Sequence, residues 1–274
     1  EIMNKKLHYF VAFFLLSTFS YSFSFEAPKT YEIQVLSSAG KMDGFVQIPK
    51  GGQYGTTSKE RPTFEELGVN YVYYPEITFT TKWDKFSMSL HGKYETFKGK
   101  AHVKEDLISH NVFIPKDSSL RTKHKYAYYG WNLHYDVITT EKWKLTPAFG
   151  INVFDFSYEF SAVNKEGDAI ANKDTRKFHA GIPTIGFKTN YQLMEKTKII
   201  FSFMSNIPMK SVKQYLDMSL LVSYNLYQNN ERELNLIGGI GYEKWKFRDS
   251  QKEMQNYMKH SIAPIYKVGL EYKF

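Results

Sequence analysis

Apolar and polar residues alternate with a period of two along most of this chain, which is the pattern of β-strands whose two faces meet different surroundings. The pattern predicts an all-β protein with about ten strands, and eight or twelve strands would fit if a segment has been merged or split. The strands are expected at residues 31–47, 69–83, 86–102, 124–138, 143–159, 178–192, 198–207, 215–227, 233–246 and 262–274.

The connections between these strands alternate between short and long. Short connections are expected at 84–85, 139–142, 193–197 and 228–232, long ones at 48–68, 103–123, 160–177 and 247–261, and an intermediate one at 208–214. Antiparallel neighbours place all odd connections at one end of a sheet and all even ones at the other. An even number of strands then brings both termini to the end with the short connections.

The last strand separates its residues into an apolar and a polar face. The apolar face carries Tyr266, Val268, Leu270, Tyr272 and Phe274, and the other face carries Lys267, Gly269, Glu271 and Lys273. The second strand divides in the same way, with Tyr71, Tyr73 and Ile77 on its apolar face. We expect these apolar faces to point outward, toward lipid.

The N-terminal segment has the order of a secretory signal peptide. Lys5 and Lys6 precede the apolar stretch 9–16, and small residues follow at Ser22 and Ser24. Eight apolar residues are too few for a membrane-spanning helix, which needs about 20. We therefore expect residues 1–24 to be a signal peptide and 25–274 to form one barrel domain. The alternative for the apolar stretch is a buried strand.

The terminal strand with its C-terminal Phe274, the signal peptide, the alternating strands and the two loop lengths together resemble the small bacterial outer-membrane β-barrel proteins. This resemblance implies a transmembrane antiparallel up-and-down β-barrel in the outer membrane of a Gram-negative cell envelope, with both termini periplasmic. It also implies that the terminal apolar face is the signal for the barrel-assembly machinery, and that outer-membrane lipid and lipopolysaccharide surround the protein.

The face opposite the apolar one carries charges of both signs. Its members are Glu76, His91, Lys93, Glu95, Asn132, His134, Asp136, Lys188, Glu243, Lys267 and Glu271. In a narrow barrel these side chains would pair with one another across the lumen, because an isolated buried charge is costly. A water-filled path for small solutes and a catalytic role for a His–carboxylate pair are the alternatives.

The first long connection contains the most distinctive sequence segment of the chain, residues 51–68. Gly51, Gly52 and Gly55 allow tight turns there. Further along, Arg61 and Pro62 precede Thr63, which with Glu66 has the spacing of a capping box around a short helical turn. We expect either a plug or binding loop at the barrel mouth, or a compact loop that packs on itself.

Composition limits the possible chemistry. The chain has no cysteine, which excludes disulfides, thiolate catalysis and a lipid-anchored N-terminal cysteine. Its net charge is +8, but basic residues are interspersed with acids in the sequence, so we expect no nucleic-acid partner. His124 and His134 are about 33 Å apart on one strand, too far to share a metal ion. No cofactor is expected, and the sequence indicates no oligomeric state.

The sequence therefore favours a non-enzymatic outer-membrane barrel with a structural, surface-binding or narrow-pore (porin-like) role. One alternative is an outer-membrane enzyme acting on lipid or peptide at the external mouth. The nearest candidate pair, His134 and Asp136, falls toward the short-turn end, and adjacent His260 and Ser261 point to opposite faces, so no catalytic residues are assigned. The other alternative is a soluble secreted barrel that binds a ligand and places its apolar residues inward.

Overall fold

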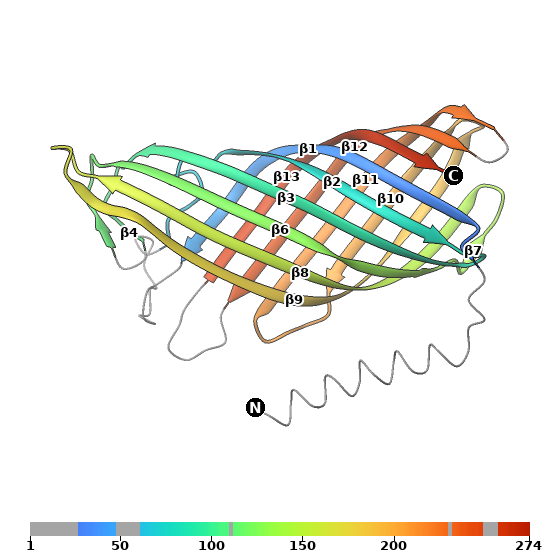
Figure 1. The fold of residues 1–274 in the computed structure, drawn as a ribbon, viewed down its shortest axis with the longest axis horizontal. Coiled ribbons are helices and arrows are strands. Elements are labelled where there is room, and N and C mark those ends of the chain that lie inside the picture. Colours follow the sequence, from blue (N-terminus) through green and yellow to red (C-terminus); the bar gives the residue numbers. More distant parts are fainter. Residues whose placement is uncertain (1–26, 48–60, 110–111, 230–231, 249–256) are drawn as a thin grey trace, which may run out of the picture.

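Ten long antiparallel strands form a closed barrel in the computed structural model (Figure 1), which describes residues 27–47, 61–109, 112–229, 232–248 and 257–274. The predicted signal peptide and Gly51, Gly52 and Gly55 lie outside these ranges. The barrel strands are β1 (Thr30–Gln47), β2 (Tyr71–Lys82), β3 (Phe86–His102), β6 (Ser119–Tyr135), β8 (Trp143–Val163), β9 (Ala169–Met194), β10 (Thr197–Asn206), β11 (Val212–Gln228), β12 (Glu233–Arg248) and β13 (Tyr257–Lys273).

Each barrel strand pairs with its neighbours in the sequence, and the first strand pairs with the last. Strand β1 runs against β13 from Glu32 opposite Lys273 to Gln47 opposite Tyr257. The remaining strands are short: β4 (Leu107–Ser109) and β5 (Val112–Ile114) form a hairpin, and β7 (Ile138–Thr139) pairs with β8. Because the ring is closed, each of the ten barrel strands has a paired neighbour on both sides for at least part of its length. The predicted up-and-down barrel is confirmed.

The two ends of the barrel differ. One end, called the turn end, holds Thr30, Phe274 and the connections 83–85, 136–142, 195–196 and 229–232 (right in Figure 1). The opposite loop end holds the described residues 61–70, 103–109, 112–118, 164–168 and 207–211, together with the strand ends Gln47, Arg248 and Tyr257. In the described residues, no helix has the length and apolar character needed to cross a bilayer.

One predicted loop is wrong. The segment 160–177 is not a long connection, since β8 and β9 continue through most of it and meet at a tight turn over residues 164–168. Strands β6 and β13 likewise begin about five residues earlier than the sequence pattern indicated. In these extensions the apolar alternation that marks the rest of each strand breaks down, since outward positions hold Ser161 and Lys259 as well as the exposed Val163.

Toward the turn end, the outward side chains form an apolar belt. Tyr71, Tyr73 and Ile77 are 63%, 74% and 56% exposed, which confirms their predicted outward direction. The belt includes Val35, Leu90, Tyr94, Tyr129, Phe149, Ile151, Ile185, Leu220, Val222, Leu236, Ile240, Tyr266, Val268 and Leu270. The side chains that alternate with it, such as Lys267 and Glu271, are buried inside. An apolar exterior over a polar interior suits hydrocarbon surroundings.

Toward the loop end, the same alternation places apolar side chains inside the barrel and polar ones outside. On β8, Phe154, Phe156, Tyr158 and Phe160 are buried inward, and the residues between them are polar. On β6, buried Leu120 and Tyr126 alternate with Arg121, Lys123 and Lys125 in the same way. This half of the barrel is dry inside and polar outside, as in a water-soluble protein, so we infer that its strands extend beyond the lipid.

Residues 61–70 fold against the interior at the loop end. Thr63 and Glu66 form the predicted capping box: the Thr63 backbone N–H donates to Glu66 Oε2 at 2.7 Å, and the Glu66 N–H donates to Thr63 Oγ1 at 3.1 Å. Phe64 and Leu67 are fully buried. The Phe64 ring packs 5.5 Å from the His124 ring. These described residues, called the plug segment below, therefore pack against the barrel interior.

Gly99 makes room for this plug segment, and its substitution tests the contact. A Cβ added at Gly99 would lie 1.9 Å from the backbone oxygen of Leu67, whereas one added at Gly181 would meet nothing within 4 Å. We predict that Gly99→Ala lowers the free energy of unfolding by about 1–3 kcal/mol, as overpacking does. Gly181→Ala is the matched control and should stay near wild type. Urea titration in lipid vesicles measures both, and equal values for the two variants would contradict the docked plug segment.

Candidate functional site

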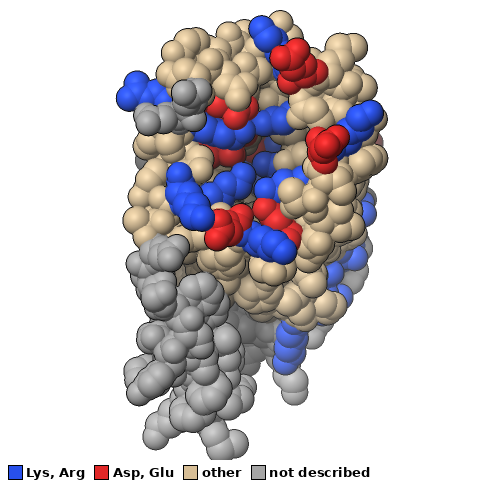
Figure 2. Space-filling view, turned by 90° about the vertical axis from the view of Figure 1, so that its right-hand side faces the viewer, with Lys and Arg blue, Asp and Glu red and all other residues tan. Residues whose placement is uncertain are grey.

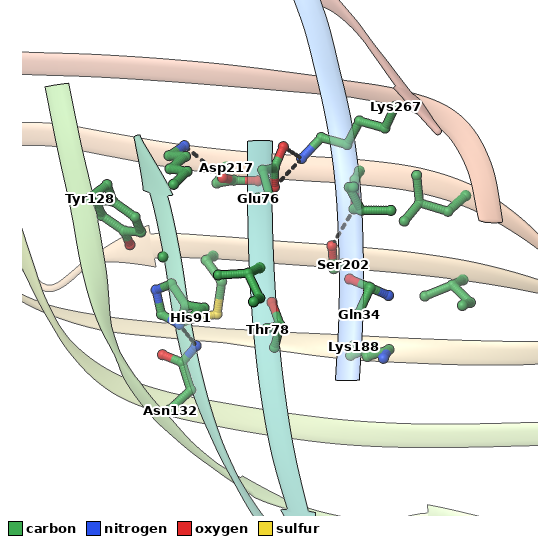
Figure 3. A pocket seen from close by; sticks show the side chains of 18 of the residues that line it. Gln34, Glu76, Thr78, His91, Tyr128, Asn132, Lys188, Ser202, Asp217 and Lys267 are labelled. Carbon is green, nitrogen blue, oxygen red and sulfur yellow. Dashed lines mark hydrogen bonds and ion pairs between the residues drawn. The ribbon is translucent and has the colours of Figure 1, made fainter. Parts of the chain in front are cut away.

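The turn-end half of the barrel interior contains polar cavities. Two adjoining cavities of about 200 and 180 Å³ share Gln34, Thr78, His91, Asn132 and Lys188 in their linings. Figure 2 shows the turn end, where Lys, Arg, Asp and Glu side chains surround a central hollow. In Figure 3 the shared residues approach the larger cavity from several strands. Both cavities lie inside the barrel and are lined by charged and polar side chains, and we treat them as the candidate site.

A layer of paired charges, called the ionic layer, bounds the cavities on the side of the loop end. Lys93 makes an ion pair with Glu243 and lies 3.6 Å from Asp217. Lys267 lies 2.8 Å from Glu76 Oε1, and His260 lies 3.3 Å from Glu243 Oε1. The Lys93 and Glu243 side chains are only 8% and 5% exposed. Such deeply buried charges are tolerated because each is matched by a partner.

A second group of ion pairs lies near the turn end. Glu271 is almost fully buried and lies 3.3 Å from Lys198 Nζ and 3.4 Å from Lys273 Nζ. Lys273 also contacts Glu233 at 3.0 Å, and Asn235 donates to Glu271 at 3.0 Å. This group comes from β10, β12 and β13, so it joins the adjacent strands β12 and β13 to β10, which lies beyond β11.

The predicted polar cluster is therefore inside the barrel but divided into several groups. Glu76, Lys93, Glu95, Glu243 and Lys267 belong to or adjoin the ionic layer, and Glu271 belongs to the turn-end group. His91 accepts a hydrogen bond from Asn132 at 3.2 Å, and Lys188 lines both cavities. His134 is hydrogen-bonded to Ser89 at 2.9 Å, while Asp136 pairs with Lys144 and accepts from Thr146. His134 and Asp136 thus have separate partners.

Several interior residues were missed from the sequence. They are Asp217, Lys198, Glu233, Asn235 and His260. Asp217 and Lys198 could have been found, because they share the strand face of buried Ser219 and Ile200. His260 preceded the predicted start of its strand, so its face could not be assigned.

An aromatic seal fills the interior between the ionic layer and the loop end. Its members are Phe64, Phe97, His124, Tyr126, Phe154, Phe156, Tyr158, Phe160, Trp245 and Phe247. The rings of Phe154 and Trp245 lie 4.2 Å apart, and those of His124 and Tyr158 lie 4.7 Å apart. Tyr128 and Tyr215 stack at 5.2 Å where the seal meets the ionic layer. His124, weighed above only as a metal ligand, lies in this aromatic cluster.

The described residues contain no group of three or more His, Asp or Glu side chains that could hold a metal ion. The carboxylates of the lumen are instead directed at lysines, as Glu76 is at Lys267 and Glu271 is at Lys198. The interior chemistry that the structure shows is therefore ion pairing and hydrogen bonding among its own side chains.

The chain matches no family model, and no curated protein matches it. Among solved structures, it is similar to the outer membrane protein OprG from Pseudomonas aeruginosa, at 14% identity and a TM-score of 0.43 over 91% of this chain and 97% of that one. It is also similar to Ail, the attachment invasion locus protein of Yersinia pestis, at 8% identity and a TM-score of 0.35 over 89% and 99% of the two chains. The toluene transporter TodX of Pseudomonas putida matches at 10% identity and a TM-score of 0.35 over 90% of each chain.

At these TM-scores the matches carry no argument about function. The chain's own geometry defines its class. A closed antiparallel barrel, an apolar belt outside and matched charges inside are the features of a transmembrane β-barrel protein.

The buried Lys93–Glu243 pair should contribute far more to stability than an exposed one. We predict that Lys93→Met lowers the free energy of unfolding by about 3–5 kcal/mol, because Glu243 and Asp217 lose a buried partner. Lys29→Met removes the exposed pair with Asp84, whose side chains are 59% and 76% exposed, and should cost at most about 1 kcal/mol. Equilibrium unfolding of both variants in lipid vesicles makes the comparison, and similar losses would contradict it.

Proposed function

We propose that this protein is an integral barrel of the bacterial outer membrane whose role is structural or surface-binding and not that of an open pore. The observation that carries the proposal is the aromatic seal. Trp245, Tyr158 and Phe156 are each at most 2% exposed and occupy the interior between the cavities and the loop end. Ions that enter the polar cavities from the turn end would meet this dry, filled section.

We further propose that the loop end faces the outside of the cell and the turn end faces the periplasm. Outer-membrane barrels have short periplasmic turns and longer external connections, and the polar extensions of β3, β6, β8 and β9 all lie at the loop end. The outward apolar face of β13, which carries Tyr266, Val268 and Leu270, supports recognition of this strand by the barrel-assembly machinery.

Planar-bilayer recording tests the seal. We predict no steady conductance steps from the wild-type protein, and steps from a variant with Tyr128, Tyr215 and Trp245 all changed to alanine. The matched control changes Tyr129, Tyr224 and Trp143 to alanine, three outward side chains that are 46%, 47% and 53% exposed, and should stay silent. Steady steps from the wild type, or silence from a folded inner variant, would contradict a lumen closed by these rings.

Cysteine labelling tests the orientation, since the native chain has no cysteine. We predict that Glu166→Cys, in the exposed turn between β8 and β9, reacts with a membrane-impermeant maleimide on intact cells. Glu195→Cys, in the exposed turn between β9 and β10, should react only after the outer membrane is opened. The reverse result would show that the barrel is inserted the other way.

A further inference from the structure

Four basic side chains gather on the outer face of the barrel, on the loop-end side of the apolar belt. Lys98 and Lys100 come from β3, and Arg121 and Lys123 come from β6; together they are called the basic patch. Lys98, Lys100 and Arg121 are exposed and Lys123 is half-buried. The sequence-based view that basic residues are merely interspersed with acids is wrong here, because strand pairing brings together residues about 20 positions apart.

The register of the two strands places like charges directly opposite each other. Lys98 pairs with Lys123, and Lys100 pairs with Arg121. Side chains in such positions have Cβ atoms about 5 Å apart, and like charges there destabilise the sheet. Within the described part of the chain, none of the four makes an ion pair, although Glu159 on β8 stands opposite Lys123. An anion bound between the strands would remove this repulsion.

The surface between these side chains is hollowed. A depression of about 450 Å³ is lined by all four residues of the basic patch together with Glu159 and Ser161. Glu159 is the single acid in its lining, so the depression has an excess of positive charge. Arginine and lysine side chains that converge in this way suit phosphate oxygens, which accept several charge-assisted hydrogen bonds.

The basic patch lies where lipid headgroups would be. Tyr94 on β3 and Tyr129 on β6 are 52% and 46% exposed and belong to the aromatic side chains of the apolar belt, a type enriched at membrane interfaces. Lys98 follows Tyr94 by four residues, which is about 13 Å along a strand. This spacing places the patch above the hydrocarbon and within reach of the phosphates of the adjacent leaflet.

We propose that the basic patch is a binding site for the phosphate groups of an anionic glycolipid, the phosphorylated lipid A portion of lipopolysaccharide. The assignment to this lipid rests on the proposed orientation, in which the loop end meets the outer leaflet. The lipid's phosphates neutralise the Lys98–Lys123 and Lys100–Arg121 repulsions, and its acyl chains lie against the apolar belt.

The test uses the purified full-length barrel in neutral detergent, with thermal unfolding and binding of fluorescently labelled lipid A as readouts. The patch variant carries Lys98→Gln, Lys100→Gln, Arg121→Gln and Lys123→Gln. The matched control removes three lysines and one arginine from the turn end, with Lys85→Gln, Lys142→Gln, Lys196→Gln and Arg232→Gln. A charge-keeping variant carries Lys98→Arg, Lys100→Arg and Lys123→Arg.

We expect lipid A to raise the Tm of the wild type, the turn-end control and the charge-keeping variant, and to leave that of the patch variant unchanged. The affinity of the patch variant for lipid A should fall at least tenfold. Without lipid, the patch variant should be at least as stable as the wild type, since like-charge repulsion has been removed.

Unchanged lipid A affinity in the patch variant would overturn the site. A lower Tm of that variant without lipid would overturn the repulsion argument. Equal effects of phosphatidylglycerol or inorganic pyrophosphate would overturn the assignment to lipid A. These measurements in detergent do not depend on orientation. If labelling shows the reverse insertion while lipid A still binds, the proposed orientation is contradicted, but the proposal that the basic patch binds phosphate groups is not.

Discussion

The whole structure depends on one constraint, which is that consecutive side chains of a strand point to opposite faces while the surroundings of the barrel change along its length. Toward the turn end the outside is apolar, so the alternate positions are free to be charged. Toward the loop end the outside is polar, and the alternate positions are aromatic. On strand β12 the interior changes from charged to aromatic between two successive inward side chains, the buried Glu243 and the buried Trp245.

The two kinds of interior support each other where they meet. Lys93 belongs to the ionic layer, yet its Nζ lies 5.0 Å from the ring centre of Tyr128 and 5.8 Å from that of Tyr74. A cation over an aromatic face is attracted to it. The charged half therefore meets the aromatic half at Lys93, which contacts both Glu243 and the ring of Tyr128.

Much of this fold could be predicted from the sequence because its main signal is local. Period-two alternation located all ten barrel strands, and the Thr63–Glu66 spacing identified the capping box. The contacts that could not be predicted depend on the register between strands that are distant in the sequence. Nothing near Lys98 in the sequence says that Lys123 stands opposite it, and nothing near Glu243 says that Lys93 will reach it. The tight turn at 164–168 was missed because the apolar–polar alternation breaks down in the strand ends that lead into it.

The short distance along the strands between the apolar belt and the basic patch fixes how deeply the barrel can sit in a bilayer. Sinking the barrel further would carry Lys98 and Lys123 into hydrocarbon, at about 2–4 kcal/mol for each cation that reached the midplane. Raising the barrel would expose the apolar side chains of Leu90 and Tyr94 to water. The apolar belt and the basic patch together hold the barrel at one depth in the bilayer. A membrane of different hydrocarbon thickness must deform around the protein before the protein shifts.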